Sequence, residues 1–133
     1  DRSAVSFSLG LPSDAVETDI LRDAVSGEEN FEHGTPVLSA GDFNKLRRQC
    51  AQIIFNDAVI GYLQNLAARL RAASLPNLSV RALIQVKGLA QAHAMIDGRD
   101  YCRPEDVQAV FVPALPLEPW TLNKSINKLL DEN

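Results

Sequence analysis

Arg81 is the side chain of this sequence best placed for chemistry with an anion. It falls in the first turn of a helix that the pattern after Ser79 predicts. The N-terminus of a helix carries partial positive charge and unpaired N–H groups, so an anion is stabilised there. A guanidinium adds a rigid fork of donors that matches phosphate oxygens. Arg81 is therefore a candidate phosphate ligand, and the alternative is a surface arginine in a cap or salt bridge.

The sequence contains no loop that could cradle a nucleotide. Such a loop reads G-x-x-x-x-G-K-[ST], because backbone N–H groups wrap the phosphates and a lysine reaches them. Its nearest counterpart, Lys87-Gly88, has the reverse order and lies in a predicted helix. Asp131-Glu132 resembles a Mg²⁺-binding pair, but it follows a helical stripe and is expected to be solvated. We therefore expect no ATP hydrolysis by this chain alone.

Imidazoles and thiols are few and widely spaced. They are His33, His93, Cys50 and Cys102. None has a second ligand at zinc spacing, and a hydrolytic triad is recognised by geometry, not by composition. We expect no metal site, surface or partly buried histidines, and reduced structural thiols of a cytoplasmic protein.

Composition excludes other classes of function. The 133 residues carry a net charge of −4 and are 46% hydrophobic, as in an ordinary globular domain. No run of Lys and Arg is present, so nucleic acid is not an expected partner. No apolar run approaches the ~20 residues that span a bilayer, so no membrane insertion is expected.

The first predicted element is a strand. Val5–Leu9 alternates apolar and polar residues, which is the period of a strand with one buried face. Because a lone strand leaves its backbone groups unpaired, its partner strands are expected upstream of this sequence.

The rest of the sequence predicts helices. Ser13 caps the first, which Gly27 ends, and a loop follows to Pro36. Four helical segments come next, beginning at Ser39 (a capping box with Asp42), at Asn56 or Asp57, at Ser79 and at Pro104. Their apolar stripes are expected to bury one another. Pro113–Pro119 is expected to be irregular because it holds three prolines, and a short helix is predicted over Thr121–Leu130. In the Pro104 helix, Glu105 and Asp106 are expected to serve the N-terminus only, and Arg99 is expected to be a lone arginine near a helix end.

Four stretches, in order, resemble AAA+ ATPases of the MoxR family. They are Asp1-Arg2 with Ser8-Leu9-Gly10-Leu11-Pro12, Pro36-Val37-Leu38-Ser39-Ala40, Leu78-Ser79-Val80-Arg81-Ala82, and Gly98-Arg99-Asp100-Tyr101-Cys102-Arg103-Pro104-Glu105-Asp106-Val107. The resemblance covers residues 1 to 112. Ser3, Leu11 and Arg103 depart from the family pattern, as does the sequence after Pro113.

The resemblance implies a fold and a role. The fold is mainly α, an AAA+ helical lid bundle of four to five helices preceded by one strand of the ATPase core. Residues 1–12 would end the core, 13–36 connect it, 37–115 form the lid, and 116–133 form a tail with a short helix. Arg81 would be the sensor 2 residue that contacts ATP. Arg2 would be an arginine finger.

The intact protein would use ATP and Mg²⁺ in a chaperone-like remodelling cycle. Its partners would be its own ATPase core, the neighbouring subunits of a hexameric ring, and a protein with a von Willebrand factor A domain. The alternative is an independent helical interaction domain with no nucleotide role. The predicted strand discriminates between them, because an independent domain has no use for it.

Overall fold

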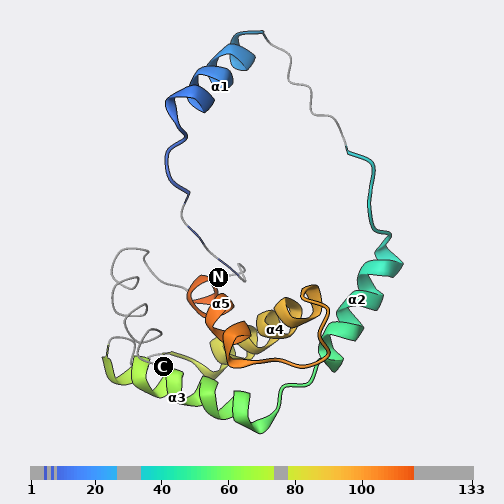
Figure 1. Ribbon diagram of the computed structural model, residues 1–133, viewed down its shortest axis with the longest axis vertical. Coiled ribbons are helices and arrows are strands. Elements are labelled where there is room, and N and C mark those ends of the chain that lie inside the picture. Colours follow the sequence, from blue (N-terminus) through green and yellow to red (C-terminus); the bar gives the residue numbers. More distant parts are fainter. Residues whose placement is uncertain (1–4, 6, 8, 27–33, 74–77, 116–133) are drawn as a thin grey trace.

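The computed structural model describes residues 5, 7, 9–26, 34–73 and 78–115, and these form five helices and no strand (Figure 1). Helices α1 to α5 span Asp14–Ser26, Ala40–Gln52, Asp57–Ala73, Val80–Ile96 and Pro104–Ala114. This mainly helical architecture confirms the predicted fold class.

The hydrophobic core lies between α3, α4 and α5. Its largest fully buried apolar side chains are Phe111, Leu66, Leu70, Leu115, Val86 and Val107. Helices α4 and α5 share the most extensive contact, and α3 packs against α5. Full burial of one such large apolar side chain contributes about 1.5–3 kcal/mol, so these three helices contribute most of the core stability, and α2 packs against α4 beside the core.

Helices α2, α3 and α4 begin at the capping residues that the sequence predicts. The Ser39 hydroxyl accepts from the Asp42 N–H at 3.1 Å, and the Ser39 N–H donates to the Asp42 carboxylate at 3.1 Å, which confirms the capping box. The side-chain hydrogen bond from Ser39 lowers the pKa of Asp42. Asn56 Oδ1 accepts from the Val59 N–H, and Ser79 Oγ from the Ala82 N–H.

A short parallel bridge ties the end of α2 to the loop between α4 and α5. The Ile54 N–H donates to Asp100 O at 2.8 Å, and the Cys102 N–H donates to Ile54 O at 2.8 Å. The buried Gln91 side chain donates to Ile53 O at 2.7 Å. The loop enters this bridge after Gly98, whose φ of 73° favours glycine. The sequence patterns predicted none of these contacts.

The predicted mutual burial of the helical stripes is wrong for α2. No residue of α2 is buried, and Phe43 is 56% exposed although it heads the predicted stripe. Val16 and Ile20 of α1 are exposed as well, and α1 stands apart from the other helices (Figure 1). An amphipathic period identifies a helix with an apolar face, but it does not identify what covers that face.

Two predictions concern residues near the ends of the sequence. The predicted strand Val5–Leu9 falls partly outside the described residues, and its described residues Val5, Phe7 and Leu9 are exposed and in no strand. It stays a prediction, because its pairing partners were expected upstream. The helix predicted over Thr121–Leu130 lies outside the described residues.

The prediction that Pro113–Pro119 is irregular is wrong for its first two residues, and residues 116–119 lie outside the described residues. Helix α5 includes Pro113 and ends at Ala114. Pro113 has no N–H to donate to the preceding turn, and the chain leaves the helix two residues later, at Leu115.

Gly88 lies in the middle of α4 and gives a first testable prediction. A methyl group added there meets no atom within 4 Å, and its φ is not positive. Gly88→Ala should therefore stabilise the fold by about 0.4–1 kcal/mol, because it reduces the entropy of the unfolded chain. The melting temperature, measured by circular dichroism, should rise by about 2–8 °C.

Gly98→Ala is the control for this substitution, because its positive φ should make alanine destabilising by about 1–2 kcal/mol. A lower melting temperature for Gly88→Ala would show that another part of the chain occupies the space beside α4.

Candidate functional site

The N-terminus of α4 presents Arg81 to solvent. Arg81 is exposed in the first turn of the helix and forms no hydrogen bond or ion pair with another described residue. Unlike the other four described helices, α4 has no acidic residue in its first turn. The positive end of the helix dipole and the guanidinium are thus not neutralised locally, which suits an incoming anion.

Exposed apolar side chains flank Arg81. Val80 and Ile84 are each 66% exposed, and Ile84 lies three residues after Arg81, on the same face of the helix. An exposed apolar surface beside an unpaired cation is typical of a binding site that another domain or protein covers.

Arg71 of α3 holds the start of α4 in place. Its guanidinium donates two hydrogen bonds to Leu78 O, from Nε at 3.0 Å and Nη2 at 2.8 Å. Leu78 is buried in the core, directly before the cap Ser79. This anchorage fixes the direction in which α4, and therefore Arg81, projects from α3.

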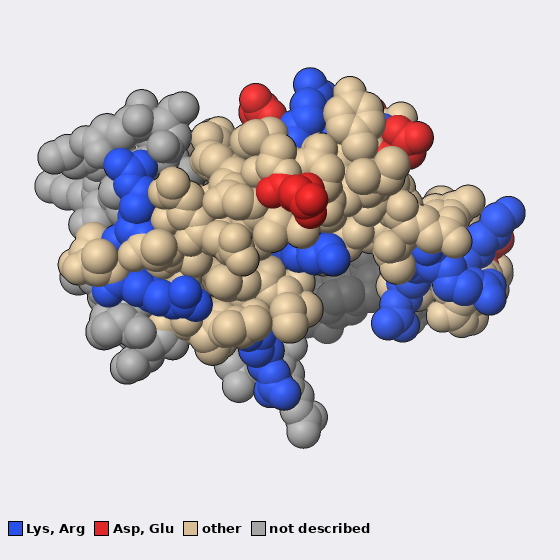
Figure 2. All heavy atoms as spheres, turned by 90° about the horizontal axis from the view of Figure 1, so that it is seen from below, with Lys and Arg blue, Asp and Glu red and all other residues tan. Residues whose placement is uncertain are grey.

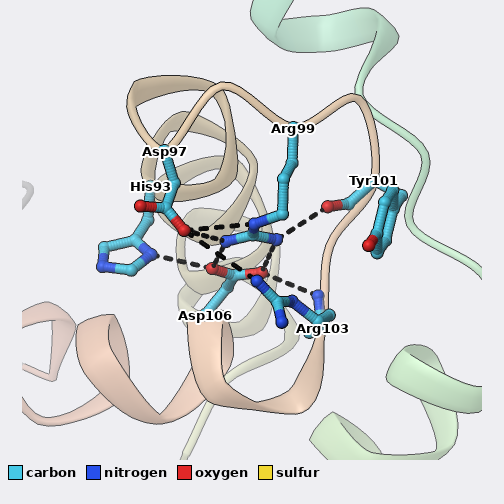
Figure 3. A network of polar contacts seen from close by, with 6 residues as sticks. All are labelled: His93, Asp97, Arg99, Tyr101, Arg103 and Asp106. Atoms are coloured by element: carbon cyan, nitrogen blue, oxygen red, sulfur yellow. Dashed lines mark hydrogen bonds and ion pairs between the residues drawn. The ribbon is translucent and has the colours of Figure 1, made fainter.

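A polar network joins the opposite end of α4 to α5 (Figure 3). At its centre, the Asp106 side chain is 1% exposed and accepts two hydrogen bonds from Arg99, from Nη2 at 2.6 Å and Nη1 at 2.8 Å. The Arg103 N–H donates to Asp106 at 2.7 Å, and His93 Nδ1 lies 2.8 Å from the same carboxylate. Arg99 also donates to Asp97 and to Tyr101 O.

This network corrects two predictions. Asp106 was expected to serve only the N-terminus of its helix, and it is instead the buried centre of the α4–α5 corner. Arg99 was expected to be a lone arginine, and its side chain is only 13% exposed with three hydrogen-bonding partners. Residue spacing could not predict either role, because Arg99 and Asp106 come together only through the path of the loop that begins at Gly98.

The network is built for structure, not for proton transfer. The hydrogen bond from Arg99, helped by those from Arg103 and His93, holds the pKa of Asp106 far below its usual range. The pKa of Arg99 is raised, chiefly by the hydrogen bond to Asp106. A carboxylate that stays ionised and has its oxygens occupied cannot act as a general base near neutral pH.

Acid should weaken the fold through Asp106. Its pKa is lowered in the folded state, so its contribution to stability is fully present above the unfolded pKa of about 3.9 and is lost as the pH falls below that value. We expect the free energy of unfolding, measured with urea, to decrease between about pH 5 and pH 2. Asp106→Asn should flatten this decrease, and an equally steep acid loss in that variant would assign it to other carboxylates.

The remaining candidates form no second site. Among the described residues, no group of three or more His, Cys, Asp or Glu side chains is placed to hold a metal ion. Cys50 and Cys102 are free, and burial raises the pKa of the Cys102 thiol to about 11, which keeps it protonated. Arg2 and His33 lie outside the described residues. None of the described helices is both long and apolar enough to cross a bilayer.

Comparisons with known proteins agree with this fold. Residues 66–117 match the family model of the AAA lid domain. The uncharacterized protein YeaC of Bacillus subtilis (strain 168) is 29% identical over 118 residues, which are 87% of this chain and 37% of YeaC. The crystal structure of a provisionally assigned ATPase from Cytophaga hutchinsonii matches with a TM-score of 0.77 at 20% identity, over 99% of this chain and 46% of that chain.

The family match falls on the helices that pack together. Helices α3 to α5 contain most of the residues that resemble the AAA lid domain. The chain spans less than half the length of both proteins that it resembles.

Proposed function

We propose that this chain supplies the lid of a MoxR-type AAA+ ATPase, with Arg81 as its sensor 2 residue. The observation that carries the proposal is the exposed Arg81 at a helix N-terminus without acidic neighbours, within the stretch that matches the AAA lid domain. A phosphate of ATP is the anion that such a position in an ATPase would meet.

The packing of α4 explains how Arg81 could couple ATP to motion. The helix is rigidly joined to α5 by the network around Asp106 and to α3 through Arg71. A phosphate contact that displaces Arg81 would therefore move α3, α4 and α5 together as a rigid body, without bending α4. Loss of the γ-phosphate would remove this contact. The three helices could then rotate together as a rigid domain, which is one of the known forms of conformational switching.

The other parts of the proposal concern the intact protein. ATP and Mg²⁺ would bind mainly to a core upstream of these residues. Arg2 would reach the nucleotide of a neighbouring subunit as an arginine finger, in a ring that we propose is hexameric and cytoplasmic. Its role would be chaperone-like remodelling, with a von Willebrand factor A domain protein as a partner.

An independent helical interaction domain remains the rival function. The exposed apolar faces of α1 and α2 suit it, since an interaction domain must present such faces to a partner. The two functions differ in the nucleotide, because an interaction domain has no use for ATP.

Phosphate release from ATP tests the proposal. The protein that extends upstream of Asp1 should hydrolyse ATP in a Mg²⁺-dependent reaction, whereas residues 1–133 alone should release no phosphate above background, because they contain no phosphate loop. Both proteins should be assayed at equal concentration, with EDTA as the control for metal dependence. An inactive but folded longer protein would favour the interaction domain, and metal-dependent turnover by residues 1–133 would contradict the lid assignment.

A further inference from the structure

Long hydrogen bonds hold the first turn of α4. The Leu83 N–H donates to Ser79 O at 3.4 Å, which is long for a backbone hydrogen bond. Ser79 Oγ accepts from the Ala82 N–H at 3.2 Å. Val80 and Arg81 are exposed, so neither side chain packs in the core. Helix ends of this kind fray, and fraying would leave Arg81 without a defined position.

Arg71 ties this turn to α3. Its Nε and Nη2 donate to the same backbone oxygen, Leu78 O, and we call these two hydrogen bonds the Arg71 clamp. Leu78 directly precedes the cap Ser79, and its own side chain is buried in the hydrophobic core. Because two donors of one rigid guanidinium converge on one acceptor, the clamp restricts that oxygen in direction as well as in distance. The carbonyl three residues before Arg81 is therefore held by α3.

The geometry of Arg71, more than its charge, distinguishes it from other cations on this side of the domain. Lys and Arg side chains predominate over Asp and Glu among the described residues on the face drawn in Figure 2, which is the side where α3 lies in Figure 1. Removing one charge from such a surface changes its potential modestly, because salt screens exposed charges. Arg71 is half-buried and directs two donors to one backbone oxygen. Its effect on Arg81 is therefore expected to arise from geometry.

We propose that Arg71 is a positioning residue for Arg81. Its clamp on Leu78 O keeps the first turn of α4 formed and so holds the Arg81 guanidinium where it meets a phosphate. The proposal rests on the sensor 2 function of Arg81 and adds a residue of α3 that acts through Arg81 and not on the nucleotide. A misplacement of about 1 Å can cost an enzyme about a hundredfold in rate. Loss of Arg71 should therefore reproduce much of the loss caused by removing Arg81.

Amide hydrogen exchange of residues 1–133, followed by NMR, tests the clamp without ATP. In Arg71→Ala the Leu83 amide should exchange about tenfold faster than in wild type, because the first turn opens more often. The Asp97 amide, which donates to His93 O at the other end of α4, should exchange at its wild-type rate. Gln64→Ala, exposed on α3 two turns before Arg71, is the control and should alter neither amide. Unchanged exchange of Leu83 in Arg71→Ala would overturn the proposal.

ATP turnover by the protein that extends upstream of Asp1 tests the link to Arg81. Arg71→Ala alone should lower kcat about tenfold, but it should change kcat by less than about twofold in a protein that already carries Arg81→Ala, because the two side chains then act on one contact. A residue with a merely structural role would lower kcat by the same factor in both backgrounds. Arg71→Lys keeps the charge but donates from a single nitrogen, so it should restore only part of kcat and of the Leu83 amide protection.

The results separate the role of Arg71 from the function on which it rests. If Arg81→Ala keeps full turnover, the sensor 2 function is wrong, and the role of Arg71 is wrong with it. If Arg81→Ala loses turnover but Arg71→Ala does not, or if the two losses multiply in the double variant, Arg81 remains the phosphate contact and Arg71 does not position it. Full turnover by Arg71→Lys with fast exchange of Leu83 would show that Arg71 contributes charge and not the clamp. Circular dichroism shows whether Arg71→Ala is folded, and if it is not, Arg71→Gln takes its place in each comparison.

Discussion

Asp106→Ala should lower the melting temperature of this chain by at least about 12 °C. The substitution leaves Arg99 without its principal partner at the α4–α5 corner and removes the acceptor of the Arg103 N–H. Breaking a buried charged pair from one side costs about 3–5 kcal/mol, and each kcal/mol corresponds to about 4 °C in a chain of 133 residues. Thermal unfolding followed by circular dichroism at pH 7 measures the effect.

Two variants separate the network from a general effect of losing an acid. Asp106→Asn keeps the shape and one acceptor oxygen, so it should lie between wild type and alanine. Asp100→Ala removes an exposed carboxylate six residues earlier and should change the free energy of unfolding by no more than about 0.5 kcal/mol. An Asp106→Ala protein that melts like wild type would show that Arg99 finds an equivalent partner, such as Asp97.

The sequence predicted the helix starts well, because a cap is a local device. Ser39 with Asp42, Ser79, and Pro104 at a first helical position each act within one turn of the chain. The residue types at these positions therefore contain most of the information needed. The same holds for the exposure of Arg81, since a first-turn arginine followed by an apolar stripe points away from the core.

The contacts that position the site could not be predicted in the same way. Arg99 and Asp106 meet only because Gly98 adopts a positive φ and the following loop pairs with Ile54, which lies more than forty residues earlier. Arg71 donates to Leu78 O, seven residues later in the sequence, and no periodicity determines that contact. Each contact depends on tertiary geometry, so residue spacing alone shows these arginines only as isolated charges.

What covers the apolar faces of α1 and α2 could not be predicted from the sequence either. Their apolar periods match those of α3, which is buried, but in α1 and α2 the described apolar side chains remain largely exposed. The apolar period indicates that an apolar face exists, and only the arrangement of the helices shows that α3, α4 and α5 contribute most of the buried core.

Arg81→Ala should reduce ATP turnover by the intact protein about tenfold to a hundredfold. If Arg81 contacts a phosphate, alanine removes a charge-assisted hydrogen bond of about 1.5–3 kcal/mol, and that loss appears in the rate when the contact is made in the transition state. Arg81→Lys keeps the charge but loses the fork, so it should recover only part of the rate. Melting should change little, since the side chain is exposed and alanine is the better helix former.

The control for Arg81 must be another cation whose loss leaves the fold intact, which excludes Arg99 because of its network with Asp106. Lys87 meets the requirement. It is exposed on the same helix but on a different face, and its ammonium group lies 5.7 Å from the centroid of the Phe55 ring. Lys87→Ala should therefore hydrolyse ATP at nearly the wild-type rate. If Arg81→Ala and Lys87→Ala both keep full turnover while remaining folded, Arg81 is a surface residue and the coupling of ATP to the lid must use another contact. If both lose turnover equally, the rate depends on the positive charge of α4 as a whole and not on a phosphate contact at its first turn.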